Sequence, residues 1–428
     1  MKTINNPASS QWGKILERPV YDMASLYETV QDVIDHVRAE GDNALKKYTE
    51  TFDSVKLDTL LVEQKEIDGA ADELSDTLKS AIQEAKANIR KFHSRQLCPD
   101  IYEETTPGVR CWQKTVAIEK VGLYIPGGTA PLLSTALMLG VPATLAGCKE
   151  IVLCTPPAED ATISAAIRYI AQILGINKVF RIGGAQAIAA MAYGTESVPR
   201  VNKIFGPGNQ YVTAAKQLVS RDSVAIDMPA GPSELAVMAD NTANPAFVAS
   251  DLLSQAEHGP DSQVILIADN EKTIESVSSE IQKQLALLPR KEIASRALAN
   301  SKMILMEDRQ EMVKLVNMYA PEHLIIACED YRELSEQINN AGSIFLGNYT
   351  PESAGDYASG TNHTLPTNGW AHAYSGLNMD AFVKKITFQE ISKYGLFNIS
   401  SAVVNMAEAE ELQAHSNAVK IRLSKYNI

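Results

Sequence analysis

Residues 121–154 read VGLYIPGGTAPLLSTALMLGVPATLAGCKEIVLC. A short apolar run, a glycine turn, an Ala- and Leu-rich stretch and a second short apolar run follow one another there. Parallel strands need a long crossover connection, which is usually a helix, so a strand that leads through a helix into another strand indicates a parallel sheet. This stretch therefore predicts an α/β fold.

The same alternation continues along the chain in two series. The first series predicts strands at 121–125, 150–154, 178–182, 202–206 and 223–228, with helices that begin near Pro131, Ala161, Ala185 and Gln210. The second predicts strands at 262–268, 302–307 and 343–347, separated by charged amphipathic helices. Helical periodicity also marks residues 26–50 and 73–97, and the last fifty residues look largely helical. We expect mostly parallel sheets covered by helices on both faces.

Composition limits the class of protein. The chain has 428 residues, of which 45% are apolar and 21% charged, as in ordinary soluble globular proteins. Its net charge of −13 argues against nucleic acid or an anionic membrane as a partner. The five cysteines form no Cys-x-x-Cys pair, and the first residues contain no apolar signal region, so we expect reduced thiols in a cytoplasmic protein.

Glycine-rich turns follow three predicted strands, at 126–129, 183–186 and 206–209. Glycine lets main-chain N–H groups approach a phosphate, and in open α/β sheets ligands bind beyond the carboxyl ends of the strands. None of the turns matches the dinucleotide fingerprint: Tyr211 stands in place of its third glycine, and no clear acidic ribose-binding residue follows at the usual distance. Tight turns that simply need glycine remain the alternative interpretation.

Polar side chains gather in the second half of the chain. Gln255 and His258 lie at i and i+3 near the end of a predicted helix, so both can face one point. The next segments with such side chains carry Glu322 and His323, within a helical run broken by Pro321, then Asp356 and His363 in the loop 350–367, and Glu410 and His415 in the tail. Nitrogen and oxygen ligands without thiolate are typical of catalytic zinc or another divalent transition metal.

Together these motifs resemble histidinol dehydrogenase. The resemblance runs in order through VGLYIPGGTAPLLSTALML, GGAQAIAAMAYGT, KIFGPGNQYVTAAK, DMPAGPSE, DLLSQAEHG, YAPEHL and ESAGDYASGTNHTLPT, and ends on the Glu-x-x-x-x-His of the tail. It covers roughly residues 20–425. It implies the oxidation of L-histidinol through L-histidinal to L-histidine, with two NAD per substrate.

The resemblance also implies a role for each matched residue. The zinc ligands would be Gln255, His258, Asp356 and His415. Glu322 and His323 would be the acid–base pair, and Ser233, Glu410 and His363 would contact substrate together with His323 and the zinc ligands. Tyr124, Gln186 and Asn209 would contact NAD. The family forms homodimers with one zinc per subunit, and the C-terminal part and His363 are expected to reach into the partner's site.

The resemblance further implies two related, incomplete Rossmann-like domains with small helical extensions at both ends. We expect an N-terminal extension at 1–22, a discontinuous domain of 23–123 with 235–377 that carries the metal and catalytic residues, an inserted NAD-binding domain at 124–234, and a helical tail at 378–428 that is exchanged in the dimer. Two alternative functions use the same residues. One is a sister dehydrogenase of another polar alcohol, such as a sulfonated diol, and the other is a zinc hydrolase with Glu322 activating water. A binding protein without activity is a third possibility, against which the intact set of motifs argues.

The chemistry of the residues fits the implied reaction. A zinc held by Gln, Asp and two His can accept the imidazole and amine nitrogens of histidinol, and so orient the substrate. Holding the carbinol carbon near the nicotinamide converts an encounter into a positioned hydride transfer. His323 has a suitable intrinsic pKa to take the hydroxyl proton, and Glu322 can make a water nucleophilic for hydration of the aldehyde.

Overall fold

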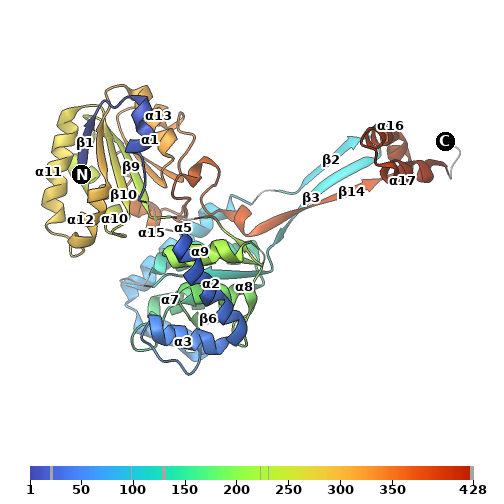
Figure 1. Ribbon diagram of the computed structural model, residues 1–428, viewed down its shortest axis with the longest axis horizontal. Coiled ribbons are helices and arrows are strands. Elements are labelled where there is room, and N and C mark those ends of the chain that lie inside the picture. Colours follow the sequence, from blue (N-terminus) through green and yellow to red (C-terminus); the bar gives the residue numbers. More distant parts are fainter. Residues whose placement is uncertain (20–22, 98, 128–131, 222, 230, 425–428) are drawn as a thin grey trace.

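The computed structural model describes residues 1–428 apart from 20–22, 98, 128–131, 222, 230 and 425–428. Figure 1 shows two helix-covered sheets, one above the other, and a long arm that projects from the place where they meet. Gly128, Thr129 and Pro131, which belong to the first predicted glycine turn and helix start, lie outside the described residues, as does Cys98.

The first strand series forms a five-stranded sheet. Its strands are β4 (Lys120–Tyr124), β5 (Glu150–Thr155), β6 (Lys178–Arg181), β7 (Lys203–Phe205) and β8 (Ala225–Ile226), all parallel in the order β6-β5-β4-β7-β8. The helices between them are α6 (Leu133–Ala146), α7 (Ala165–Leu174), α8 (Gly184–Tyr193) and α9 (Gln210–Val219). Gly147 and Gly175 end α6 and α7 in the left-handed conformation, at φ 84° and 70°. The predicted α/β class with parallel sheets is confirmed.

The second series forms a six-stranded parallel sheet. Its strands are β9 (Glu234–Ala239), β10 (Gln263–Ala268), β11 (Lys302–Leu305), β12 (His323–Ala327), β13 (Ser343–Leu346) and the N-terminal β1 (Lys2–Asn5), in the order β1-β11-β10-β9-β12-β13. Its helices are α10 (Pro245–Ala256), α11 (Glu271–Leu285), α12 (Lys291–Asn300), α13 (Arg309–Tyr319), α14 (Tyr331–Ser335) and α15 (Glu352–Tyr357). Apart from β1, both sheets have the strand order third, second, first, fourth, fifth, so the two units share one topology.

Two neighbouring interior strands of this sheet, β9 and β12, are absent from the prediction. The expectation that a helical run broken by Pro321 carries Glu322 and His323 is wrong for His323, because α13 ends at Tyr319, Ala320 takes a left-handed φ of 50°, and β12 begins at His323. The residue before a proline is disfavoured in helical conformation, which explains why the helix stops there. The predicted structureless loop 350–367 also contains a helix, α15.

The N-terminal helices pack on the five-stranded unit. They are α2 (Met23–Glu40), α3 (Asp42–Phe52), α4 (Gln64–Asp68) and α5 (Asp76–Ser94), preceded by α1 (Trp12–Ile15). Val30 and Ile34 of α2 share a buried apolar cluster with Ile188 of α8, and Ile89 of α5 shares another with Leu137 of α6. The sequence-based division instead grouped residues 23–123 with 235–377. The packing differs because the apolar faces of these helices are buried against α6–α9.

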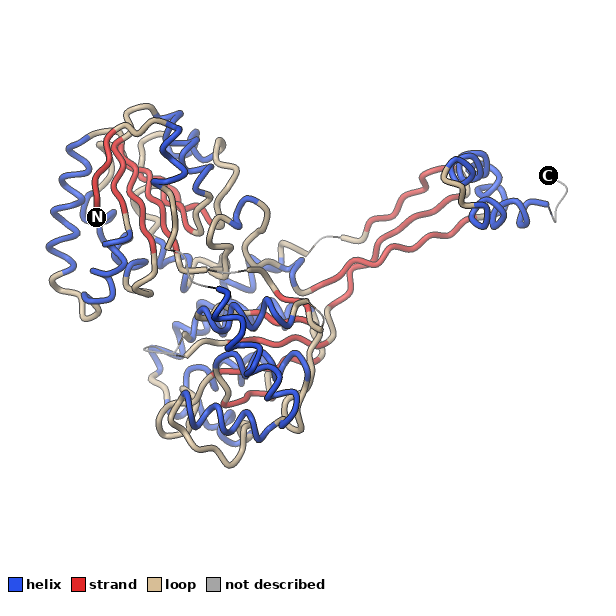
Figure 2. The backbone as a smooth tube through the Cα atoms, viewed as in Figure 1, coloured by secondary structure: helices blue, strands red, loops and turns tan. Residues whose placement is uncertain are grey.

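The arm is a three-stranded antiparallel sheet, β2 (Ile101–Thr106), β3 (Val109–Ala117) and β14 (Val383–Ile391), in the order β14-β3-β2. Beyond it lie α16 (Lys393–Ala409) and α17 (Gln413–Ser424) at the far tip (Figure 2). The tail expected to be helical thus begins with a long strand. Short 3-10 turns lie at Ser9–Gln11, Gly69–Glu73, Trp370–His372 and Met379–Ala381.

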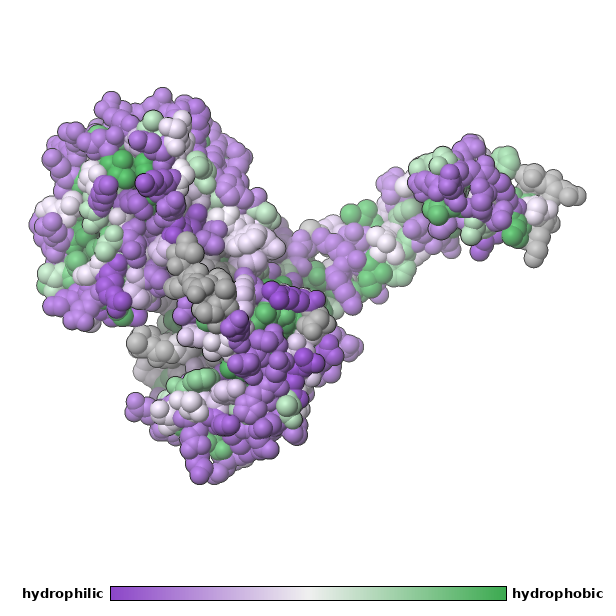
Figure 3. Space-filling view, viewed as in Figure 1, coloured by the Kyte–Doolittle hydropathy of each residue, from purple (hydrophilic) through white to green (hydrophobic). Residues whose placement is uncertain are grey.

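Apolar side chains remain uncovered along the arm, where Figure 3 shows hydrophobic patches. Tyr102, Ile386, Phe397 and Met406 are exposed by 61%, 42%, 49% and 65%. A short antiparallel sheet with both faces in water buries too little to be stable on its own, so this surface is suited to contact with another molecule. Within the described part of the chain, no helix combines the length and apolarity that crossing a membrane would require.

Candidate active site

A cavity of about 330 Å³ lies between the two sheet units. One wall comes from the carboxyl edge of the five-stranded sheet, where Gly127 follows β4 and Gly208 follows β7. The opposite wall comes from the amino edge of the six-stranded sheet, where Ser233 precedes β9 and His323 begins β12. The two sheets therefore face the same cavity with opposite ends of their strands.

His323 is buried and surrounded by carboxylates. Its Nδ1 lies 3.3 Å from the main-chain oxygen of Glu234, 3.6 Å from Glu322 Oε2 and 3.8 Å from Glu352 Oε1, while its Nε2 lies 3.7 Å from Asp356 Oδ1. The buried Nε2 has no hydrogen-bond partner among the described residues. Burial alone would lower the pKa of His323, but the charges of Glu352 and Glu322 and the contact with Asp356 outweigh it and raise the pKa well above its usual value.

Glu322 is held by the main chain of the neighbouring strand. The N–H of Glu234 donates to Glu322 Oε2 at 2.9 Å. The side chain of Glu234 in turn forms a buried bidentate pair with Arg18, whose Nε and Nη2 donate to its two carboxylate oxygens at 2.6 and 2.9 Å. Arg18 also donates to the main-chain oxygen of Tyr319 and lies over that ring, 4.1 Å from its centroid. A residue of the N-terminal segment thus fixes the strand that positions the predicted acid–base pair.

Three of the four predicted metal ligands lie around this cavity. His258 and Asp356 line it, and Gln255 is fully buried at the end of α10. With its amide nitrogen turned towards Glu352, Gln255 donates to that carboxylate and accepts from the Glu234 N–H at 3.3 Å. Ligand atoms of His323, Glu352 and Asp356 also lie within 4.8 Å of one another. Amide oxygen, imidazole nitrogen and carboxylate oxygen form a donor set that fits zinc.

The fourth predicted ligand is not part of this cluster. His415 lies in α17, and Glu410 ends α16; both side chains are exposed on the tip of the arm, away from the cavity of their own chain (Figure 1). One chain therefore brings together Ser233, Gln255, His258, Glu322, His323, Asp356 and His363, and leaves Glu410 and His415 outside.

His363 belongs to the cavity of its own chain. Its Nδ1 lies 3.1 Å from the main-chain oxygen of Asp356, and its Nε2 lies 3.2 Å from the hydroxyl of Thr135. The expectation that His363 reaches into a partner's site is therefore corrected. The physical reason is that α15 packs against α10, which directs the residues after α15 towards the cavity of the same chain. Burial there lowers the pKa of His363.

The predicted NAD residues lie along the carboxyl edge of the five-stranded sheet. The Tyr124 hydroxyl accepts a hydrogen bond from the Gly184 N–H at 3.0 Å, and the buried Gln186 leaves its Oε1 without a partner among the described residues. Asn209 caps α9 by accepting from Tyr211 N and Val212 N. Tyr124 and Gln186 lie beneath the glycine turns, whereas Asn209 is exposed above them.

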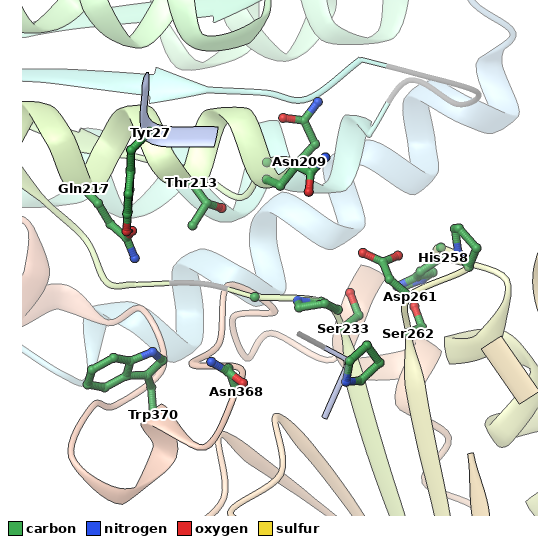
Figure 4. Close-up of a pocket in the computed structure, with 17 residues that line it drawn as sticks. Tyr27, Asn209, Thr213, Gln217, Ser233, His258, Asp261, Ser262, Asn368 and Trp370 are labelled. Carbon is green, nitrogen blue, oxygen red and sulfur yellow. The ribbon is translucent and has the colours of Figure 1, made fainter. Parts of the chain in front are cut away.

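A second cavity, of about 550 Å³, adjoins the first and shares Gly208, Ser233 and His258 with it. Figure 4 shows Thr213 of α9 and the N-cap residue Asn209 on one wall, facing Ser233 and Asn368 across the cavity. The cleft between the units is therefore wider than the cluster around His323. It leaves room beside His258 for a group that comes from outside the chain.

Sequence reasoning missed several residues at this site. Arg290 lines the cavity although no motif marks it, and Thr135 lines it but received no role within its motif. Glu352 stands in the predicted functional loop but received no role, and the Arg18–Glu234 pair joins positions 216 residues apart. Of these residues, only Glu352 could have been found from the sequence, because it is a carboxylate four residues before Asp356 in the same predicted loop.

Three of the described cysteines are poorly suited to act as catalytic thiols. Cys111, Cys148, Cys154 and Cys328 are free, and burial raises the pKa of Cys148 to about 11 and of Cys328 to about 12. Burial also raises the pKa of Cys154. Thiols of this kind are protonated at neutral pH, so they act as small apolar side chains.

Comparison with known proteins gives one family. The family model described as histidinol dehydrogenase matches residues 16–423. The histidinol dehydrogenase of Bacteroides thetaiotaomicron is 60% identical over 424 residues, which covers 99% of each chain. That of Vibrio parahaemolyticus is 53% identical over 421 residues, covering 98% of this chain and 97% of its own length.

Solved structures agree with this result. The crystal structure of histidinol dehydrogenase from Elizabethkingia anophelis matches with a TM-score of 0.97 and 52% identity, covering 100% of this chain and 99% of that one. An acetylating aldehyde dehydrogenase from Geobacillus thermoglucosidasius has a TM-score of 0.51 at 14% identity and covers 88% of this chain and 99% of its own, which shows a likeness of fold alone.

Proposed function

The chain belongs to the histidinol dehydrogenase family, the NAD-dependent oxidoreductases of the final steps of histidine biosynthesis, and we propose that its site works as a zinc centre shared by two chains. The reaction is the four-electron oxidation of L-histidinol through L-histidinal to L-histidine. The observation that carries the proposal is the cluster of Glu322, His323 and Asp356 in a cleft between two sheet units.

Gln255, His258 and Asp356 would hold the metal from one chain. When bound, zinc supplies a fixed position for the imidazole and amine nitrogens of histidinol, and NAD accepts the hydride from the oriented carbon. Glu352, which accepts from the Gln255 amide, keeps that ligand in one orientation. Tyr124, Gln186 and Asn209 would position NAD along the carboxyl edge of the five-stranded sheet, with Ser233 and His363 against the substrate.

His323 is suited to act as the general base at its Nε2. A hydrogen bond from Nδ1–H to the Glu234 main-chain oxygen selects the tautomer whose Nε2 is free to accept a proton. The charges of Glu352 and Glu322, followed by the contact with Asp356, raise the pKa of His323 and so stabilise the imidazolium that forms when His323 takes the substrate proton. As a metal ligand, Asp356 would share its charge with the cation.

Glu322 supports the second oxidation. Its carboxylate is fixed by the Glu234 N–H and lies beside His323, so it can orient a water molecule and accept its proton when the aldehyde is hydrated. His323 then takes the proton of the hydrate as the second hydride leaves. Both half-reactions thus use one cluster, and the aldehyde need not be released between them.

The remaining ligands would come from a second copy of the chain. His415 and Glu410 lie on an arm that projects away from the body, and the arm has uncovered apolar side chains that a homodimer would bury. The cleft beside His258 has room for an incoming group. A biosynthetic role and the free thiols of the described cysteines support a cytoplasmic location.

The function is tested by the stoichiometry of the reaction. Limiting histidinol is added to the zinc-loaded enzyme with excess NAD, while NADH absorbance and free aldehyde are followed. We expect two NADH per histidinol with little aldehyde trapped by a carbonyl reagent. One NADH per histidinol, with stoichiometric trapped aldehyde, would contradict the shared cluster, and hydrolysis without NADH would indicate a zinc hydrolase instead.

A further inference from the structure

A third cavity, of about 470 Å³, lies at the carboxyl end of β5. It is lined by the turns after β4 and β5, including Gly127, Thr155 and Pro156, and by the start of α7. Gly127 is also part of the wall of the cavity around His323, so the two cavities meet at the turn after β4. The proposed chemistry uses no residue that is particular to this third cavity.

Asp53 enters this cavity from a distant part of the sequence. Leu61 forms an antiparallel bridge with Phe180 of β6, flanked by hydrogen bonds from Arg181 N to Leu60 O and from Val62 N to Val179 O, both 2.8 Å. Because the two segments run in opposite directions, the residues before Leu60 lie beyond the carboxyl end of β6. Asp53, the C-cap of α3, is thereby brought over the edge of the sheet.

One oxygen of the Asp53 carboxylate lacks a hydrogen-bond partner among the described residues. This atom, Oδ2, is buried. Burial raises the pKa of Asp53 to about 6, and the Asp53 charge adds to the larger effect of burial in raising the pKa of Tyr124 to about 12. A buried polar atom without a partner needs an explanation, and a bound hydrogen-bond donor is one.

The residues that line the cavity indicate which kind of hydrogen-bond donor a ligand would present to Asp53. No described residue that lines it is basic, and a second acid, Glu159, stands at its rim, so a phosphate would be repelled. Hydroxyl groups, in contrast, can donate to both carboxylates. In doubly wound sheets with this strand order, an acidic residue near the end of the second strand binds the adenosine ribose of a dinucleotide, and β5 is the second strand here.

We propose that this cavity binds the adenosine ribose of NAD, with Asp53 accepting hydrogen bonds from the ribose hydroxyls and excluding a 2′-phosphate. The inference rests on the proposed use of NAD and adds the part of the site that selects it. The acid is supplied by a helix that precedes the βα unit. For this reason no acidic ribose-binding residue stands at the usual distance after the glycine turn.

The test compares Asp53→Asn with a matched control, Glu50→Gln, an exposed acid on the same helix. Each variant is assayed with NAD, with the analogue whose adenosine ribose lacks the 2′-hydroxyl, and with NADP. Losing a hydrogen bond to a charged group should raise the KM for NAD about 10- to 100-fold in Asp53→Asn. The KM for histidinol and the zinc content should stay unchanged, and Glu50→Gln should behave as the wild type.

The analogue decides between the ribose and other donors. We expect the wild type and Asp53→Asn to bind the 2′-deoxy analogue with similar affinity, because the hydroxyl that Asp53 accepts from is missing. The ratio of the KM for NADP to the KM for NAD should be smaller in Asp53→Asn than in the wild type. Equal losses with NAD and with the analogue would overturn the ribose assignment and indicate the adenine amine, which a deaminated NAD analogue would then confirm. An unchanged KM for NAD in Asp53→Asn would overturn the site as a whole.

Direct binding separates this inference from the proposed function. NAD affinity is measured by calorimetry on the zinc-loaded protein without substrate, and the unfolding midpoint of each variant shows that it is folded. If the wild type binds NAD but oxidises no histidinol, the proposed function is wrong. The ribose site is then still tested by comparing the NAD affinity of Asp53→Asn with that of the wild type. If Asp53→Asn does not fold, Asp53→Glu and Glu159→Gln replace it in the same assays. An NAD affinity equal to that of the wild type in both variants would contradict the inference.

Discussion

The main-chain N–H of Glu234 donates to Glu322 Oε2 at 2.9 Å, and this bond joins the neighbouring strands β9 and β12 of the six-stranded sheet at their amino ends. The oxygen of the same residue accepts from His323, so one peptide segment orients both members of the proposed acid–base pair. Arg18 holds that segment through the buried Glu234 side chain. The geometry of the catalytic pair therefore depends on an ion pair that contacts no substrate.

Replacing Arg18 by Met leaves the Glu234 charge buried without its cationic partner, with the Asn368 N–H still donating to it. Breaking a buried pair in this way costs about 3–5 kcal/mol of unfolding free energy, and kcat should fall with little change in the KM for NAD. Arg18→Met with Glu234→Gln should recover part of the stability, since no uncompensated charge remains. Denaturant unfolding of the single and double variants measures this, and strictly additive losses would contradict the coupling.

Glu322 and His323 should separate the two oxidations. His323→Asn is expected to slow both steps by about 10²–10⁴-fold, the usual value of a general base. Glu322→Gln should mainly slow the oxidation of histidinal, because only that step needs an activated water. The assay supplies histidinol and histidinal separately to each variant, and equal damage to both steps by Glu322→Gln would remove its role in hydration.

The sequence predicted the parallel α/β class and most strands because the predicted strands are short, largely apolar runs that alternate with helical stretches. It missed β9, since ELAVMA is short and Ala-containing, and periodicity cannot distinguish such a run from a buried helix. It missed β12 because Pro321 lies between a helix and a strand. The strands of the arm were not predicted for another reason. Most residues of β14 are exposed, so no buried face imposes an alternation of polar and apolar residues.

The candidate site was predictable to the extent that its residues are neighbours in sequence. Gln255 and His258 share one helix end, and Asp356 and His363 share one loop, so their proximity follows from local geometry. Arg18 and Asp53 could not be found in this way. Each acts far from its own segment, brought there by chain packing that only the fold reveals.

Metal removal should abolish activity, and zinc should restore it. His258→Asn removes a proposed direct ligand, so its loss of zinc affinity should exceed the roughly 10–100-fold typical of outer-shell changes, and Glu352→Gln should fall within that range. Zinc content after dialysis against a chelator of known affinity gives both values. Full activity in protein verified as metal-free by elemental analysis would contradict the zinc assignment.

Asp53 should make stability depend on pH. Its pKa is about 6 in the folded protein, against 3.8 ordinarily, so the folded state binds the proton more tightly than the unfolded state. The contribution to stability is therefore complete at low pH and is lost as pH rises through this window. Without NAD, the unfolding midpoint of Asp53→Asn should exceed that of the wild type more at about pH 7.5 than at about pH 4.5. A difference independent of pH would contradict a buried, unpartnered carboxylate.

The shared site predicts complementation between inactive chains. In a two-fold dimer of His323→Asn with His415→Asn, one site receives both lesions and the other receives neither. The pair His323→Asn with His363→Asn serves as the control, because the structure places both residues in the cavity of the same chain. Every site of that mixed dimer then carries one lesion, and no activity should return.

The most direct measurement is therefore the activity of co-refolded His323→Asn and His415→Asn chains, carrying different tags so that mixed dimers can be isolated and counted. Random pairing makes about half of the dimers mixed, so roughly a quarter of all sites should regain the production of two NADH per histidinol. Recovery near that level, with none in the His323→Asn and His363→Asn control, is the result that a site completed by the partner's tail predicts. No recovery in confirmed mixed dimers, or equal recovery in the control, would contradict it.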